Sequence, residues 1–263
     1  MELILLQEGV QGYLLIFARV GSFMSVAPFW SGQTIPLRIR IFLCLIISMV
    51  LLPVVWEQNL IEIDSNFLIV FAYLAIRETL LGMLLGLVSS LLFYCVQVAG
   101  QVIDTQMGFG MVNVLDPQSG GQLPVIGNLF YLLAIILFLS VDGHHHLLYA
   151  LNSSFAFLPL GTVDFPRIVW YEAGNLFGQI IAFALRVSLP VAGILFMTDM
   201  ALGIIARTVP QMNVFVLGIP VKIIVGLLTL IIVLPLLAKL LQMLFAEIFT
   251  NLDRFLFLLS SGT

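Results

Sequence analysis

Long apolar runs separated by short polar stretches make up most of this sequence. The long runs cover residues 10–30, 41–55, 67–103, 123–141, 168–205 and 221–237. A helix that crosses a bilayer needs roughly 20 mostly apolar residues, so the pattern indicates about six helical segments of membrane dimensions. We therefore expect an all-α polytopic membrane protein, in which about six apolar helical segments form hairpins and several segments are kinked or broken.

Two of these runs do not have the length of a single crossing. The run 41–55, only about 15 residues long, contains Pro53 and is either a short span or the arm of a buried or tilted hairpin. The run 67–103 is too long for one span and carries Arg77 and Glu78. It is either two helices with a break at these charges or one long helix whose charges are satisfied by neighbouring protein.

Further break points are expected later in the chain. Residues 147–161 predict a short helix or a re-entrant turn. Pro190 predicts a kink within 168–205, because proline removes a helical hydrogen bond. Residues 206–220 indicate a break, and an amphipathic tail follows the last apolar run.

Composition strengthens the membrane assignment. Hydrophobic residues make up 61% of the 263 positions and charged residues only 9%, whereas about a quarter of a soluble domain is charged. The excess apolar surface must face lipid or other apolar subunits. The net charge of −4 is spread thinly, without the basic block expected of a nucleic-acid-binding protein. Cys44 and Cys95 lie inside apolar runs, where packing is expected rather than a disulfide or a metal site.

Several charged residues interrupt the apolar runs, and each costs a few kcal/mol if it faces hydrocarbon. Taken singly, any of them can snorkel to the interface or pair with an opposite charge in the same chain. Taken together, they favour a subunit that buries polar groups against partners or lines a watery path. These candidate buried charges are Arg19, Arg77, Glu78, Asp104, Glu172, Arg186 and Asp199.

Two rows of small residues recur at four-residue spacing, which puts each row on one face of a helix. Such rows let the backbone of another helix approach closely in a membrane. We expect both rows to form packing contacts between subunits. The first row is Gly82, Gly86 and Ser90, and the second is Gly174, Gly178 and Ala182.

The third apolar run leads into a long polar and glycine-rich interval. Gln97, Gln101 and Asp104 fall at i, i+4 and i+7, so they form a polar stripe on one helix face. The loop 108–110 is either a gate, because its glycines permit unusual backbone shapes, or an ordinary helix connection. The length of the polar interval, 104–122, favours the gate, since long ordered loops tend to be functional.

A succession of motifs in the middle of the chain points to one family. The motifs AGQVIDTQMGFGM at 99–111, DP with SGG at 116–121, VDGHHHLL at 141–148 and SSFAFLPLG at 153–161 occur in that order. This succession resembles the FliR family of type III secretion export gate subunits. The resemblance covers nearly the whole chain. Further similar positions are Arg19, Ile35, Pro36, Leu37, Arg38, Arg77, Glu78, Gly82, Gly86 and 185–190.

The resemblance implies a protein-export gate. In that family one copy joins several copies of FliP and FliQ in the bacterial inner membrane at the flagellar basal body, and unfolded rod, hook and filament proteins pass through the assembly. FlhA and FlhB homologues are further expected partners. It also implies a single membrane domain over 1–263, with a FliP-like part at 1–205 and a C-terminal hairpin arm with an amphipathic tail at 206–263.

The family also implies a plug, because its corresponding loop lies in the central passage; here that loop is about 104–122. The glycines would supply freedom, Met107, Phe109 and Met111 the seal, and Asp116 with Pro117 a fixed turn. The residues expected in the plug are Gln106, Met107, Gly108, Phe109, Gly110, Met111, Asp116, Pro117, Gly120 and Gly121.

Three consecutive histidines invite a metal site. On a helix His144, His145 and His146 point about 100° apart and cannot all bind one ion, so only Asp142 or a distant residue could complete a site. We expect no metal. Asp142, Gly143 and His144 match a structural turn of the family instead, with the Asp142 side chain capping the next helix. Without a phosphate-binding loop, a nucleophile elbow or paired carboxylates, we expect no catalytic residue and no cofactor.

Three alternatives stay open. An injectisome subunit of the same family shares the fold and the passage and differs in its substrates. An ion-coupled secondary transporter would use Asp104, Glu172 or Asp199, and it predicts an internal repeat with broken helices. An intramembrane metalloenzyme centred on 144–146 would hold metal at a stoichiometric level.

Overall fold

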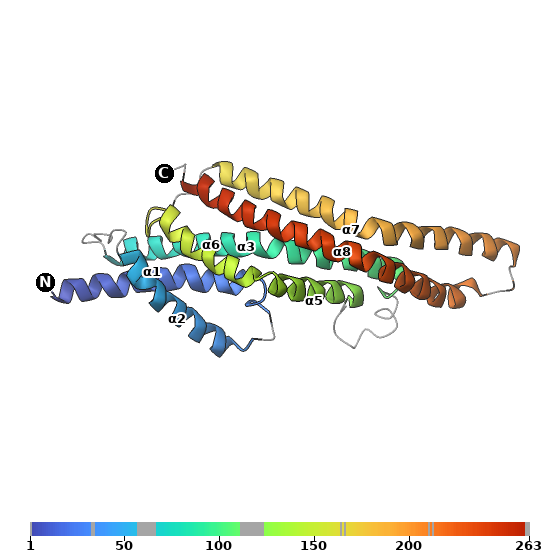
Figure 1. Ribbon diagram of the computed structural model, residues 1–263, viewed down its shortest axis with the longest axis horizontal. Helices are drawn as coiled ribbons and strands as arrows, with labels where there is room; N and C mark the ends of the chain where they lie inside the picture. The colour runs from blue at the N-terminus through green and yellow to red at the C-terminus, as the bar shows by residue number, and fades with distance from the viewer. Residues whose placement is uncertain are drawn as a thin grey trace. The chain divides into compact units, whose positions relative to one another are not determined.

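The helices follow the apolar runs closely. The computed structural model describes residues 2–32, 35–56, 67–110, 124–163, 165, 167–209, 211 and 213–260, and these residues form helices without a single strand (Figure 1). The all-α prediction is therefore confirmed. The helices are α1 (Glu2–Val26), α2 (Leu37–Trp56), α3 (Phe67–Met107), α5 (Val125–Ser140), α6 (Gly143–Phe157), α7 (Arg167–Thr208) and α8 (Val214–Ser260).

Five of these helices, α1, α2, α3, α7 and α8, are long and apolar enough to cross a membrane. The pair α5 and α6 makes a sixth candidate span if the two helices, which are separated by a short break, are counted as one. The prediction of a polytopic membrane protein with about six helical segments, some of them broken, is confirmed.

The short run and the long run both resolve into single helices. The helix α2 has 20 residues because it begins before the apolar run, at Leu37, and takes in Arg38 and Arg40. It is therefore long enough for a full span. The helix α3 has 41 residues and passes Arg77 and Glu78 without a break, so the alternative of one long helix is the right one.

The expected break near the C-terminus is present but shorter than predicted. The helix α7 extends to Thr208 and contains Pro190, where the kink stays a prediction. The helix α8 already begins at Val214 and continues through Pro220 and Pro235 to Ser260. The break between α7 and α8 is therefore shorter than the predicted 206–220, and the predicted tail is part of α8. Prolines are tolerated inside membrane helices because neighbouring groups satisfy the carbonyls that they leave free.

The chain divides into two compact units. Unit 1 is Met1–Leu91, Asp142–Phe177 and Ala246–Thr263, and unit 2 is Leu92–Val141 and Gly178–Phe245. The helices α3, α7 and α8 contribute residues to both units. Each unit therefore brings together helix segments that are far apart in the sequence.

An aromatic cluster forms part of the core of unit 2. The ring of Phe93 on α3 lies 5.3 Å from that of Phe138 on α5 and 6.0 Å from that of Phe245 on α8. The rings of Phe138 and Phe245 are 5.5 Å apart. All three side chains are buried. The high phenylalanine content thus has a packing role here, since aromatic pairs add stability beyond their buried area.

Candidate functional site

A buried ion pair lies at the centre of unit 1. The side chains of Arg19 on α1 and Glu78 on α3 are both fully buried, and the Arg19 Nε atom donates to Glu78 Oε2 at 2.6 Å. An isolated charge in such a place would be very unfavourable. The charges of Arg19 and Glu78, which the sequence left without partners, are therefore satisfied inside the chain.

The last turn of α6 and the residues that follow it supply further contacts to the Arg19–Glu78 ion pair. Arg19 Nη1 donates to the carbonyl of Ser154 at 3.0 Å, and Nη2 donates to the carbonyl of Leu158 at 3.0 Å. The guanidinium also lies over the Phe155 ring, 4.2 Å from its centroid. Glu78 Oε1 accepts the backbone N–H of Gly161 at 3.0 Å. The motif SSFAFLPLG thus supplies the backbone and ring contacts that hold the ion pair.

The first row of small residues packs against α1 beside this cluster. A Cβ atom on Gly82 would overlap the carbonyl oxygen of Arg19 and the Ser22 hydroxyl, and one on Gly86 would lie 2.9 Å from the carbonyl oxygen of Phe23. Ser90, the third member, is buried. The close helix approach occurs within this chain, and contacts of the row with another subunit stay a prediction.

In unit 2, Asp104 near the end of α3 caps the beginning of α5. Its side chain is buried, and the two carboxylate oxygens accept the backbone N–H groups of Ile126 and Gly127 at 3.0 to 3.1 Å. Pro124, at the N-cap position of α5, makes no side-chain cap of its own. Asp104 therefore does from a distant helix what an N-cap residue normally does, and its charge suits the helix dipole.

Two glycines allow α3 and α5 to meet at this point. A Cβ atom on Gly100 would overlap Gly127 Cα and lie 2.6 Å from Gly127 N. One on Gly127 would lie 3.0 Å from the carbonyl oxygen of Gln97. Since even an alanine has no room, these glycines bring the α5 N-terminus within reach of Asp104.

The helix α3 ends at the MGFG motif in a Schellman arrangement. Gly108 has φ +87°, which glycine adopts readily, and its N–H donates to the carbonyl of Thr105 at 3.2 Å. The N–H of Phe109 donates to the carbonyl of Asp104 at 3.1 Å. The first glycine of the motif therefore terminates a helix, and Asp104 contacts both ends of the connection from α3 to α5.

The expected plug residues lie partly within the described chain. Met107 is fully buried against Gly226 of α8, where a Cβ atom would lie 2.9 Å from Met107 Cγ. Gln106, Gly108 and Phe109 are half-buried, and Gly110 is exposed. Met111, Asp116, Pro117, Gly120 and Gly121 lie outside the described residues. Met107 thus packs inside its own unit, and the role of the others as a plug stays a prediction.

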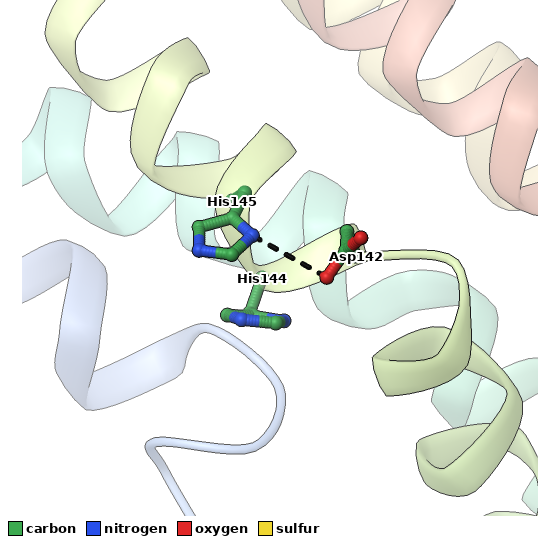
Figure 2. A group of neighbouring side chains, drawn as sticks. All are labelled: Asp142, His144 and His145. Carbon is green, nitrogen blue, oxygen red and sulfur yellow. Dashed lines mark ion pairs between the residues drawn. The ribbon is translucent and has the colours of Figure 1, made fainter.

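The histidine motif gathers three possible metal ligands at the start of α6. Figure 2 shows Asp142, His144 and His145, with His145 Nδ1 3.5 Å from Asp142 Oδ1. The ligand atoms lie within 4.8 Å of one another, and Asp142 and His145 are largely exposed. His146 points elsewhere and stacks on Phe249 of α8 at 4.5 Å. Three donors are thus available, and the expectation of no metal stays untested.

The predicted side-chain cap by Asp142 was wrong. Asp142 does occupy the N-cap position of α6, but its side chain makes no cap hydrogen bond. Its φ of 55° lies in the left-handed region, and its carboxylate faces His145 instead (Figure 2). The backbone carbonyl of Asp142 accepts the N–H of His145 at 2.9 Å, which begins the helix.

Most of the remaining charges in the apolar runs also have partners. Glu172 on α7 accepts from Arg254 on α8 at 3.2 Å, and Asp199 on α7 pairs with Lys222 on α8. The Arg77 guanidinium lies 4.8 Å from the centre of the Tyr73 ring. The three carboxylates that a transporter would use, Asp104, Glu172 and Asp199, are thus all engaged in hydrogen bonds or ion pairs.

Arg186 and the second row of small residues differ from these groups. Arg186 is exposed on α7, and within the described chain its guanidinium has no hydrogen bond or ion pair. Gly174, Gly178 and Ala182 are exposed as well. The space around a Cβ atom on either glycine is open to 4 Å.

Sequence reasoning missed the partners of the charges. The residues that it did not single out are Gly100, Gly127, Ser154, Leu158, Gly161, Lys222, Gly226 and Arg254. A signal existed for some of them, because the motifs AGQ and SSFAFLPLG contain four of these positions, Gly100, Ser154, Leu158 and Gly161. Nothing in the sequence around Lys222 or Arg254 marked them as partners of acidic residues on another helix.

Comparison with known proteins identifies the family. The model of a family described as bacterial export proteins, family 1, matches residues 10–248. The chain belongs to this family. This membership confirms the resemblance that the motifs of the middle region indicated. The chain is thus a multi-pass membrane protein of a bacterial export family.

Individual relatives agree over most of their length. The flagellar biosynthetic protein FliR of Bacillus subtilis is 37% identical over 224 residues, which cover 84% of this chain and 85% of the relative. That of Escherichia coli K12 is 30% identical over 240 residues, covering 91% and 90%. The Yop proteins translocation protein T of Yersinia pestis is 29% identical over 232 residues, covering 87% of each chain.

Proposed function

We propose that this chain is a subunit of the type III protein-export gate of the bacterial flagellum. The observation that carries the proposal is the family match over 10–248, together with relatives that are named flagellar biosynthetic protein FliR. One copy joins FliP-like and FliQ-like subunits in the inner membrane at the basal body, and FlhA-like and FlhB-like proteins are further partners. Unfolded rod, hook and filament proteins pass through. The subunit works without catalysis, cofactor or metal.

The gate opens by movement of the connection between α3 and α5. In support of this step, Asp104 caps the α5 N-terminus while its carbonyl accepts the N–H of Phe109, so both ends of the connection are held by one residue. A segment with fixed ends can change shape without loosening the helices that carry it. Residues 106–121 close the passage at rest and yield to substrates.

The two parts of the chain have different tasks in this proposal. The FliP-like part, 1–205, carries the connection that closes the passage, and the C-terminal part, 206–263, is an arm. The length of α8, 47 residues, and its ion pairs to α7 support a stable arm that follows its preceding helix.

Co-purification tests the assembly. The chain is tagged after Thr263, extracted in a mild detergent from its own host, and every membrane protein that stays bound is identified and counted. FliP-like and FliQ-like proteins at higher copy than the chain support the proposal. Recovery of the chain alone, while a tagged unrelated multi-pass protein from the same host behaves as before, overturns it.

Permeability tests the gate. The assembly is reconstituted into vesicles with wild-type chain or with a chain in which 111–121 is replaced by a short glycine-serine linker. The linker variant is expected to release a small trapped dye faster than the wild type. Equal release from both, with equal subunit content, would remove the connection from the gate.

An injectisome subunit is the second candidate, because the Yop translocation protein T of Yersinia pestis covers 87% of this chain. Complementation separates the two. The flagellar proposal predicts that the gene restores swimming to a strain of its host that lacks the endogenous copy, and that it leaves injectisome secretion unrestored in a Yersinia strain that lacks the translocation protein. The opposite pattern would favour the injectisome.

A further inference from the structure

One face of α7 combines a charge with an exposed apolar surface. In unit 2 the exposed positions Gly178, Ala182, Arg186, Leu189 and Gly193 follow one another at spacings of four, four, three and four residues. At about 100° per residue they lie on one stripe of the helix. The buried positions of α7 lie on the opposite side and include Ala184, Val187, Val191 and Leu195. The stripe therefore points away from the core of its own unit.

The helix α7 is too long for lipid alone to cover it. Its candidate span, Val169–Thr208, has 40 residues and is only 28% buried within the chain. At 1.5 Å per residue it is about 60 Å long, which is twice the roughly 30 Å of a hydrocarbon core. Outside the bilayer its exposed leucines and isoleucines would meet water unless protein covers them.

Arg186 lies near the middle of this length, between Leu185, which is 51% exposed, and Leu189, which is 61% exposed. If this part of α7 is in the bilayer, an unpaired arginine there costs about 3 kcal/mol or more. If it is outside the bilayer, the apolar side chains around Arg186 need a protein surface. Both positions favour a protein neighbour over lipid or water, and the positive charge of Arg186 favours an acidic group on that neighbour.

We infer that the stripe centred on Arg186 docks one helix of a neighbouring membrane subunit, and that this helix places an aspartate or glutamate opposite the guanidinium. Arginine forms two parallel hydrogen bonds with a carboxylate, which suits a contact away from water. The open space at Gly178 and Gly193 lets the partner backbone come close. The inference rests on the proposed function for the identity of the neighbouring subunit. The acidic residue expected on that subunit follows from the charge of Arg186 alone.

Three substitutions in the tagged full-length chain test the inference, with the assembly purified from its own host. Arg186→Glu is expected to reduce the recovery of at least one partner subunit by about tenfold or more, because two carboxylates would then face each other. Arg186→Lys, which keeps the charge, should retain most of the partner. Gly193→Leu should also reduce recovery, because it fills the space for the partner helix.

Two controls separate docking from folding. Within the described residues Arg186 has no hydrogen bond or ion pair, and a Cβ atom on Gly193 would meet open space, so the isolated variants should unfold at the wild-type temperature in detergent. Arg207→Glu changes an exposed arginine in the last turn of the same helix and should leave partner recovery unchanged. Equal losses in Arg207→Glu and Arg186→Glu would overturn the inference.

Suppressors identify the opposing carboxylate. Partner genes are mutagenised in the Arg186→Glu strain, and changes of an aspartate or glutamate to lysine or arginine in a membrane helix are expected among the suppressors.

If the wild type retains its partners and Arg186→Glu retains them equally, the inference fails while the proposed function stands. If Arg186→Glu loses bound phospholipid but no subunit, a lipid phosphate occupies the face, and the inference also fails. If the wild type retains no partner, the proposed function itself fails.

Discussion

The two rows of small residues invite comparison, because they have the same spacing and opposite surroundings. On α3, Gly82 and Gly86 meet the backbone of α1 closely, beside an arginine whose nitrogens are bonded to Glu78 and to backbone carbonyls. On α7, Gly178 lies in open space, about two turns from an arginine without a described partner. The spans differ accordingly, with 67% of α3 and 28% of α7 buried. The same sequence pattern thus serves packing within the chain in one place and is left exposed in the other.

Breaking the buried ion pair should have the largest effect. Arg19→Met leaves Glu78 buried without its partner, so we expect about 3–5 kcal/mol of lost stability, measured by thermal unfolding of the purified chain in mild detergent. The double variant Arg19→Met with Glu78→Met should recover a large part of this loss. Arg186→Met is the matched control on the exposed face and should change stability by less than about 0.5 kcal/mol. Equal effects of Arg19→Met and Arg186→Met would erase the contrast between the two faces.

Filling the two rows should sharpen the comparison. Gly82→Leu forces a side chain against the carbonyl of Arg19, so we expect a loss of about 1–3 kcal/mol or more in the isolated chain. Gly178→Leu meets open space and should stay within about 0.5 kcal/mol of the wild type. Both are read out as unfolding temperatures in detergent. A destabilising Gly178→Leu would mean that the face of α7 is covered by its own chain.

This comparison also marks the limit of what the sequence could predict. Apolar runs and their lengths predicted the helices, because a membrane helix needs little beyond hydrophobicity. The motif SSFAFLPLG marked the segment that surrounds Arg19 and Glu78, but it did not indicate which contacts that segment makes. The sequence could not assign partners to Arg19 and Arg186, since a charge in an apolar run looks the same whether its partner is 59 residues away or in another subunit. Nor could it foresee that α8 continues through Pro235, because that depends on neighbours that satisfy the free carbonyl.

Removing the remote helix cap should act locally. Asp104→Ala deletes both acceptors at the start of α5, and we expect a loss of about 1–2 kcal/mol, in the range of N-cap substitutions. Hydrogen exchange of the amides of Ile126 and Gly127 should speed up. The amide of Gly161, which donates to Glu78 in the other unit, serves as the internal reference and should exchange at its wild-type rate. Uniform acceleration of all three amides would indicate global loosening instead.

The exposed ion pair between α7 and α8 should matter least. Arg254 is 64% exposed at its side chain, so its pair with Glu172 gains little in the presence of water and salt. We expect Arg254→Ala to lower stability by no more than about 1 kcal/mol, and the difference should shrink as salt is added. A loss comparable to that of Arg19→Met would mean that lipid or protein shields this pair.

The contacts of Arg19 also impose an order on biosynthesis. Arg19 leaves the ribosome 59 residues before Glu78 and 139 residues before Leu158. At a synthesis rate of about 20 residues per second, its charge waits about 3 s for the carboxylate and about 7 s for the last carbonyl. During that interval the first helix is a poor membrane segment on its own. Retention of this nascent helix by the insertion machinery until α3 arrives would shield the charge of Arg19 from lipid, so we expect α1 to reach its final place in the membrane only after α3 has been made.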